Sequence, residues 1–195
     1  MPKVNYHKYF DIDLVLDEIK KYLPNVNGER FLKAFYFAEQ AHSGQLRKDG
    51  VTPYIVHPVE IVKILIRLHA DEETLISALL HDVPEDTEHD IDEIHHLFGE
   101  KIAFLVDGIT KLSTVHYQQH MPERQVESLK KMFLHSAEDL RVIIIKLADR
   151  LHNMSTLQYI EEPEKRLRIA RETLEIYVPI ANLLGIQELK SKLED

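Results

Sequence analysis

The stretch "LLHDVPEDT", residues 79–87, stands where an apolar segment gives way to polar residues. Its titratable side chains are His81, Asp82, Glu85 and Asp86, with a proline among them. Carboxylates at the edge of a core are costly unless they are paired or bind a cation. The stretch is therefore either a solvated helix terminus or half of a metal site.

The chain on both sides of this stretch has the apolar spacing of helices almost throughout. The segment "RVIII", residues 141–145, has the β-branched content of a buried strand, but it continues without a breaker into residues with helical spacing, so we expect one buried helix. The class predicted is all-α, a compact bundle of about ten helices. They are expected at about 13–23, 31–41, 58–69, 72–82, 91–97, 100–106, 124–136, 139–157, 164–175 and 177–184. Residues 113–123 are expected to form a mobile loop.

Composition limits the classes of protein that this chain can belong to. Its 195 residues are 44% hydrophobic, enough to bury roughly 70% of the unfolded surface, so we expect residues 1–195 to form one domain. No stretch approaches the ~20 apolar residues of a membrane span, and the N-terminus lacks a signal pattern. There is no cysteine, which rules out thiolate metal ligands and leaves the cytoplasm as the expected compartment. A net charge of −9 argues against non-specific nucleic-acid binding but permits an anionic small substrate.

Two further residues are candidates for the same site. His57, in "PYIVHPVEI", precedes a proline at the expected start of a helix, and it is either a capping or core histidine or a ligand. Asp149 lies inside the most hydrophobic helix, where it either forms a salt bridge with Lys146 or Arg150 or binds a cation. Adjacent helical residues do not face each other, which weakens the pairing with Arg150. Together with the histidine and aspartate of the first stretch, these residues offer two imidazoles and two carboxylates, a set that suits Mn²⁺, Fe²⁺ or Zn²⁺.

The spacing of "H…HD…D" at these positions resembles the HD superfamily of metal-dependent phosphohydrolases. The surrounding segments are similar to the hydrolase domain of the RelA/SpoT homologue family, from about residue 28 to residue 195: "AHSGQLRKDGVTPYIVHPVEI", "LISALLHDVPEDT", "LVDGITKLS", "VIIIKLADRLHNMSTL" and "RIARETLEIYVPIANLLGI". Members of that family hydrolyse the alarmones ppGpp and pppGpp, removing the 3′-pyrophosphate to leave GDP or GTP and lowering alarmone in the stringent response. The resemblance thus implies the HD-domain fold, a guanine-nucleotide substrate and a metal-dependent hydrolase.

The resemblance also implies a role for each polar residue of the candidate site. The metal ligands, usually for Mn²⁺, are His57, His81, Asp82 and Asp149. Glu85 and Asp86 match the acidic pair that activates or orients the attacking water, while the metal lowers the pKa of that water and draws charge from a phosphate oxygen. Both carboxylates lie four residues past the histidine–aspartate pair, about one helical turn further on, where they point into the same cavity.

Pro84 departs from the apolar residue that the family usually has between Val83 and Glu85. Proline removes a backbone donor and disfavours helix at the residue before it. We therefore expect the acidic pair to lie on a turn, with altered geometry and intact chemistry.

Substrate contacts are implied for residues in a loop and on two helices. Arg47 and Lys48 match residues that hold the nucleotide, and the planar face of Arg47 suits stacking on guanine. The others are Asn153 and Thr156, which match positions near the base and ribose, and Lys165 and Arg166, which match further pocket contacts or belong to a solvated charged face.

Two other functions remain open at this point. One is an HD phosphohydrolase that acts on another nucleotide, and the other is a weakly active regulatory module of a longer RelA/SpoT-type protein. The chain ends at "LKSKLED", where long family members continue into a synthetase domain. One expectation is therefore that it is the N-terminal part of a longer bifunctional synthetase/hydrolase. The sequence carries no signal for the oligomeric state or for a preference between ppGpp and pppGpp.

Overall fold

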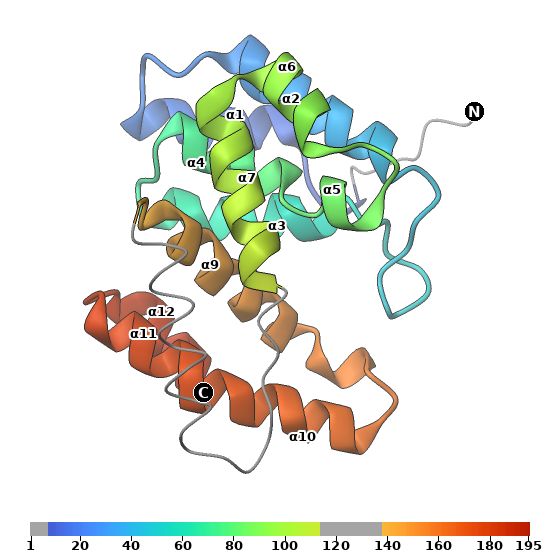
Figure 1. The fold of residues 1–195 in the computed structure, drawn as a ribbon, viewed down its shortest axis with the longest axis vertical. Coiled ribbons are helices and arrows are strands. Elements are labelled where there is room, and N and C mark those ends of the chain that lie inside the picture. Colours follow the sequence, from blue (N-terminus) through green and yellow to red (C-terminus); the bar gives the residue numbers. More distant parts are fainter. Residues whose placement is uncertain (1–7, 114–137) are drawn as a thin grey trace. The chain divides into compact units, whose positions relative to one another are not determined.

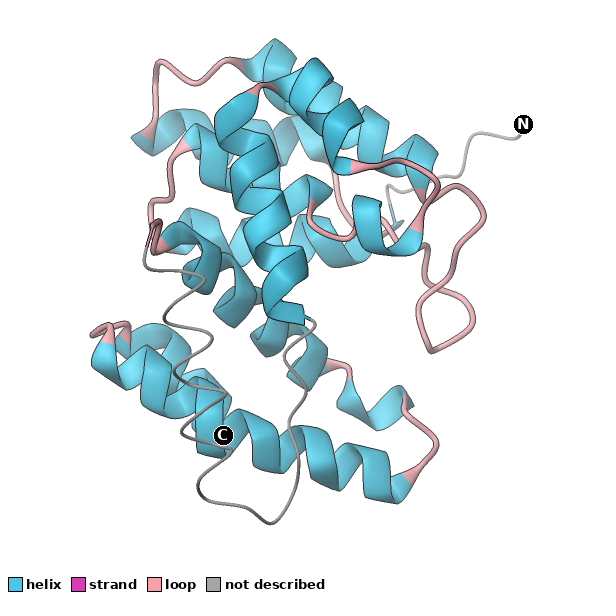
Figure 2. Cartoon of the chain, viewed as in Figure 1, coloured by secondary structure: helices cyan, strands magenta, loops and turns pink. Residues whose placement is uncertain are grey.

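Helices make up nearly all the regular structure in residues 8–113 and 138–195, the residues that the computed structural model describes (Figure 2). Within these residues the only strand-like pairing is an isolated bridge between Leu46 and Pro53. The predicted all-α class is confirmed. No helix in the described residues is long and apolar enough to cross a membrane.

The chain divides into two compact units, Met1–Ala103 and Phe104–Asp195, and the prediction of a single domain stays a prediction.

The first unit is built from helices, and α1, α2, α4 and α6 each begin with a side-chain cap (Figure 1). Asp71 accepts a hydrogen bond from the backbone N–H of Thr74 at 2.8 Å, and Asp90 accepts one from the N–H of Glu93 at 2.9 Å, which satisfies N–H groups that helix starts leave unpaired. Gly99 takes a positive φ of 91° and separates the last two helices. The helices are α1 (Ile12–Tyr22), α2 (Gly28–Ala41), α3 (Val56–Arg67), α4 (Glu72–Leu80), α5 (Val83–Asp86), α6 (Ile91–Phe98) and the first turn of α7 (Glu100–Ser113).

The core of the first unit lies where α2 and α3 pack against α4. Phe31, Ile61, Leu65 and Leu75 are fully buried there, each on the apolar stripe of its helix. This packing holds the first turn of α3 and the end of α4 inside one rigid unit. It therefore fixes the two positions from which the candidate histidines project.

The helix predicted for residues 72–82 ends two residues early, at Leu80. A separate one-turn helix, α5, follows at Val83–Asp86, with Pro84 in its first turn. Proline is tolerated there because an N–H in the first turn of a helix has no intrahelical partner in any case. The expectation that Pro84 would keep Val83 out of a helix is therefore wrong. The acidic pair does lie on a single turn of its own.

The second unit holds the rest of α7, the predicted buried helix as α9 (Arg141–Ser155), and a C-terminal series of helices. α7 runs beyond the predicted 100–106 to Ser113 because Ile109 and Leu112 continue its buried stripe. The strand alternative for 141–145 is excluded, since these residues lie in α9. The helix predicted for 124–136 lies outside the described residues, as does the predicted mobile loop except for Ser113, which ends α7.

The C-terminal series departs from the prediction in two places. α10 (Pro163–Glu172), a π turn η3 (Thr173–Tyr177) and α11 (Val178–Leu183) follow one another without the predicted break. Pro179, in the first turn of α11, has no N–H and cannot donate the α-helical hydrogen bond to the carbonyl four residues before it. The π turn just before it accommodates this missing hydrogen bond. A further helix, α12 (Gln187–Glu194), was not predicted, although Leu189 and Leu193 bury one face of it.

Candidate metal centre

Two buried histidines of the first unit face each other. His57 lies in the first turn of α3 and is 2% exposed, and His81 directly follows α4 and is 1% exposed. Their ring centroids are 5.4 Å apart. The packing of α3 against α4 thus brings together two candidate ligands that are 24 positions apart in the sequence.

Asp82 turns its carboxylate toward both rings. Its Oδ1 lies 3.0 Å from His81 Nε2, and its Oδ2 lies 3.4 Å from His57 Nε2. Burial alone would raise the pKa of Asp82, but the charges and hydrogen bonds of His81 and His57 outweigh burial and hold this pKa well below its usual range. The carboxylate is therefore ionised and available as a ligand.

The tautomer of His81 is determined by its other nitrogen. Nδ1 lies 2.9 Å from the carbonyl oxygen of Ala78, and because a carbonyl only accepts, Nδ1–H must donate. In neutral His81 the Nε2 atom then carries a lone pair, and it points at an ionised carboxylate oxygen that also only accepts. Two acceptors at 3.0 Å need a cation between them, either a proton on the ring or a metal ion.

These donors fit a divalent metal. An N–H of a ligating histidine that donates to a backbone carbonyl is the usual support for metal coordination by the other nitrogen. Two imidazole nitrogens and a carboxylate, with no sulfur in the chain, favour a first-row ion bound through nitrogen and oxygen. Both rings are buried and already aligned on one carboxylate, so little side-chain entropy is lost on binding.

Tyr54 joins this centre to the predicted acidic pair. Its hydroxyl lies 2.7 Å from Asp82 Oδ2 and 2.9 Å from Asp86 Oδ2, and donates to these carboxylates. Burial raises the pKa of Tyr54, and the two carboxylates raise it further, so the phenol keeps its proton and acts as a donor. Asp86 is thus held beside Asp82, and both Glu85 and Asp86 are exposed on the single turn of α5.

The sequence interpretation missed Tyr54 and also His42, which lies just after α2. The His42 ring stacks on the Tyr54 ring with centroids 4.5 Å apart and planes 22° apart. Burial lowers the pKa of His42, and the hydrogen bond with Gln45 raises it by less. The net lowering favours the neutral ring. The one signal for Tyr54 is its place three residues before His57, on the turn that leads into α3. His42 has no such signal.

Arg47 lies in the predicted loop between α2 and α3. Asp49 Oδ1 accepts hydrogen bonds from the N–H groups of Val51 and Thr52, and the N–H of Arg47 donates to the Thr52 carbonyl at 2.7 Å. These bonds fold the loop back on itself and place the Arg47 guanidinium carbon 5.6 Å from the centroid of the Tyr54 ring. The side chain predicted to stack on guanine therefore already lies on an aromatic ring. Lys48, its exposed neighbour, belongs to the same loop.

Asp149, the fourth predicted ligand, belongs to the second unit. It is 5% exposed, and its two oxygens lie 2.9 Å from Lys146 Nζ and 2.6 Å from Asn153 Nδ2. The alternative salt bridge to Lys146 is thus present. Arg150 instead contacts Glu172 at 3.3 Å and the Tyr177 hydroxyl at 3.0 Å, as the argument against the adjacent pairing predicts.

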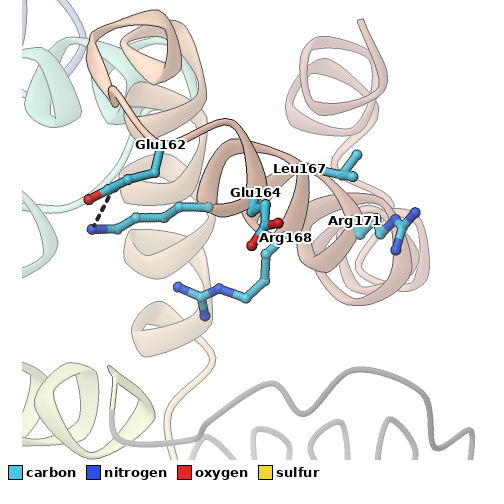
Figure 3. A pocket seen from close by; sticks show the side chains of 6 residues that line it. Glu162, Glu164, Leu167, Arg168 and Arg171 are labelled. Carbon is cyan, nitrogen blue, oxygen red and sulfur yellow. Dashed lines mark ion pairs between the residues drawn. The ribbon is translucent and has the colours of Figure 1, made fainter.

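The remaining predicted substrate contacts are dispersed over α9 and α10. Asn153 binds Asp149, and the Thr156 hydroxyl donates to backbone carbonyls at the end of α9, 3.2 Å from the Asn153 oxygen. Lys165 lines an open pocket of about 590 Å³ on α10, where it pairs with Glu162 at 3.6 Å. Figure 3 shows that Arg168 and Arg171 of this pocket extend in different directions, so they do not converge on one anion. Arg166 is not among the residues that line it.

Comparison with known families and sequences finds relatives of one kind. Residues 34–187 match the family described as "HD domain". The chain is 46% identical over 179 residues to "GTP pyrophosphokinase" of Myxococcus xanthus, covering 91% of this chain and 23% of that protein. It is 48% identical over 177 residues to "Bifunctional (p)ppGpp synthase/hydrolase SpoT" of Escherichia coli strain K12, covering 91% of this chain and 25% of that protein. The chain thus spans about a quarter of the length of these relatives.

A solved structure resembles the chain over most of its length. It is described as "A metazoan ortholog of SpoT hydrolyzes ppGpp and plays a role in starvation responses". The two share 30% sequence identity with a TM-score of 0.67, and the match covers 85% of this chain and 92% of the other. The similarity therefore extends over nearly the whole of that structure, in contrast to the much longer sequence relatives.

Proposed function

Because the chain belongs to the HD domain family, and within it to the RelA/SpoT homologues, we propose that it hydrolyses ppGpp and pppGpp to GDP and GTP with release of pyrophosphate. The observation that carries the proposal is the opposition of His81 Nε2 and Asp82 Oδ1 at 3.0 Å, which fits a divalent cation. The relatives named for ppGpp hydrolysis support the choice of substrate. A nucleotide substrate of this kind makes the cytoplasm the proposed compartment.

The proposed ligands of a single Mn²⁺ ion are His57, His81, Asp82 and Asp149. The first three are supported by their geometry in the first unit. Asp149 is supported by the sequence motif and by its burial, because an ionised carboxylate inside an apolar helix needs strong partners. Mn²⁺ is proposed from the family resemblance and from the nitrogen and oxygen donors.

A divalent ion at these ligands supplies Lewis acidity and a water of lowered pKa. The protein's own contribution is the placement of its carboxylates. Asp86, held by Tyr54 beside Asp82, is positioned to accept a proton from a water next to the ligands. Glu85 lies on the same turn and is proposed to orient that water. Attack of the water on the phosphorus bound to O3′ breaks the P–O3′ bond. Pyrophosphate then leaves with the oxygen of that water, and the ribose 3′ oxygen takes a proton.

Substrate binding is proposed to involve the loop residues Arg47 and Lys48, whose cationic side chains compensate for the acidic surface of the chain. Arg47 lies over an aromatic ring, and its planar guanidinium is of the kind that stacks on bases. Asn153, Thr156, Lys165 and Arg166 are retained as proposed contacts from the second unit. Of these, Asn153 has a second role as a partner of Asp149.

The test is product analysis with a panel of nucleotides, with Mn²⁺ and after its removal by a chelator. We expect ppGpp to give equal amounts of GDP and pyrophosphate only when Mn²⁺ is present. Release of orthophosphate, or equal turnover of nucleotides that lack a 3′-pyrophosphate, would identify another HD phosphohydrolase.

A second candidate is a regulatory module with little turnover of its own. It is favoured by the name of the Myxococcus relative, which refers to synthesis rather than hydrolysis, and by the small share of the relatives' length that the chain spans. Binding of ppGpp without any product, in the presence of bound Mn²⁺, would support this candidate.

A further inference from the structure

The Tyr54 hydroxyl is the point at which the carboxylates of Asp82 and Asp86 meet. It lies within hydrogen-bond distance of Asp82 Oδ2 and of Asp86 Oδ2, at 2.7 and 2.9 Å. Two carboxylates that converge on one point repel each other, and a donor between them offsets that repulsion. A phenol has a single proton to donate, so the two oxygens share one donor. The position of this hydroxyl therefore sets the distance between the Asp82 and Asp86 carboxylates.

The same loop is attached to α5 at a second point. Gln45 Nε2 donates to the backbone carbonyl of Asp86 at 2.9 Å, and the Tyr54 N–H donates to the Gln45 carbonyl at 3.0 Å. α5 is a single turn without a side-chain cap at its start, and one turn of helix has little stability of its own. Its position thus depends on contacts such as these.

The ring of Tyr54 provides the third contact. His42 stacks on it at 4.5 Å, and the Arg47 guanidinium carbon lies 5.6 Å from its centroid. Arg47 therefore rests on a ring whose own hydroxyl holds the carboxylates. The loop that carries the proposed nucleotide-binding residues and the centre that carries the metal ligands share one side chain.

We propose that Tyr54 is a positioning residue with two separable parts, a hydroxyl that aligns Asp86 with Asp82 and a ring that supports Arg47 for nucleotide binding. The role of the ring rests on the proposed function. The role of the hydroxyl at the Asp82 ligand is independent of the substrate, and it can be measured with Mn²⁺ alone.

Tyr54→Phe removes the hydroxyl and keeps the ring with its contacts to His42 and Arg47. We expect ~10-fold weaker Mn²⁺ binding and, at saturating Mn²⁺, a further ~10-fold lower kcat, with KM for ppGpp close to that of the wild type. Tyr36→Phe is the matched control, since it removes an exposed hydroxyl from α2 and should change neither quantity. Unchanged Mn²⁺ affinity together with unchanged kcat in Tyr54→Phe would overturn the proposal. Full recovery of kcat at saturating Mn²⁺ would overturn the alignment of Asp86.

A double-mutant cycle shows whether the hydroxyl acts through Asp86. If it does, Tyr54→Phe should lower kcat much less in an Asp86→Asn background than in the wild type, because the residue that it aligns is already impaired. Additive losses would mean that Tyr54 and Asp86 act independently, which contradicts the proposal.

Tyr54→Leu removes the ring as well. Because the ring also packs edge to face against His57, with centroids 5.9 Å apart, the two variants are compared at saturating Mn²⁺. There Tyr54→Leu should have a KM for ppGpp several-fold higher than that of Tyr54→Phe. Equal KM values for the two variants would show that the ring does not support Arg47. If the wild-type protein binds Mn²⁺ but turns over no ppGpp, the proposed function fails, and the Mn²⁺ affinity of Tyr54→Phe still decides the role of the hydroxyl.

Discussion

A buried histidine whose Nδ1–H donates to a carbonyl has one nitrogen left for chemistry. In His81 that nitrogen points at an Asp82 oxygen 3.0 Å away, and while the ring is neutral neither atom can donate to the other. Asp82→Asn replaces an anionic ligand with a neutral amide. We expect it to abolish hydrolysis and remove most bound metal, with helicity unchanged by circular dichroism, whereas Asp92→Asn on the exposed face of α6 should behave as wild type. Full metal content with normal turnover would remove Asp82 from the site.

Substitution of either acidic residue of α5, Glu85 or Asp86, should lower kcat and leave the bound metal content unchanged. Glu85→Gln and Asp86→Asn each keep the size of the side chain and lose its charge, so proton transfer is impaired. The expected loss in kcat is ~10²–10⁴-fold, typical of general acid–base groups. Metal content measured alongside kcat separates the roles, with Glu88→Gln as an exposed control. Loss of metal from either variant would make that residue a ligand instead of a catalyst.

Arg47 tests how the loop recognises its substrate. Arg47→Ala should raise KM for ppGpp and relax discrimination against adenine analogues, with bound metal unchanged. Arg47→Lys keeps the charge and loses the planar face, so it should restore binding only in part. Wild-type base preference in the lysine variant would show that stacking is not the means of recognition. A uniform loss of affinity for every 3′-pyrophosphate nucleotide would show that Arg47 binds phosphate.

At the scale of single residues, motif spacing and the family resemblance singled out His57, His81, Asp82 and Asp86, which lie together in the first unit. Neither singled out Tyr54 or His42. Both belong to the loop region between α2 and α3, and no periodicity indicates how a loop folds back onto a helix end. Their contacts depend on the turn at Asp49, which the sequence marks only as rich in turn formers.

At the scale of elements, α7 and α9 approach each other closely at Gly108. A Cβ added there would lie 2.9 Å from Val142 Cγ2, on a β-branched side chain that cannot easily move away. Gly108→Ala should cost about 1–3 kcal/mol of unfolding free energy through overpacking, more than the ~0.5–1 kcal/mol that alanine gains in a helix.

Urea denaturation measures this effect. Gly28→Ala is the matched control, because its Cβ would meet the mobile end of Leu16 at 3.1 Å and should cost less. In a Val142→Ala background, Gly108→Ala should lower the free energy of unfolding by less than it does in the wild type. An equal cost in that background would mean that the loss does not arise at this contact.

Helices with a long, regular apolar stripe were predictable from the sequence, as α3 and α9 illustrate. The differences occur where another effect competes with the stripe. α4 ends at Leu80 and α5 begins separately, with Pro84 tolerated in its first turn. The π turn before Pro179 joins two segments that were predicted to be separate, and α12 is too short for its two buried leucines to give a clear period.

At the scale of the whole molecule, composition indicated an acidic globular protein without thiolate ligands. The helical class came from apolar periodicity, and the metal-dependent enzyme came from the motifs and the family resemblance. The proposed phosphate-rich substrate would require local positive charge on this negative chain. We propose that Arg47, Lys48 and a cation at the histidine–aspartate centre supply it. The number of domains was not predictable in the same way, because it depends on contacts between distant segments and not on local pattern.

The central claim is that a divalent ion held by His57, His81 and Asp82 is required for release of pyrophosphate from ppGpp. The most direct measurement is one titration of the metal-free protein with Mn²⁺, in which bound Mn²⁺ and the rate of pyrophosphate release are followed together. The account predicts that both rise with the same midpoint and that saturation corresponds to a single ion per chain. Pyrophosphate release at full rate before Mn²⁺ binds, or complete Mn²⁺ binding without release, would contradict it.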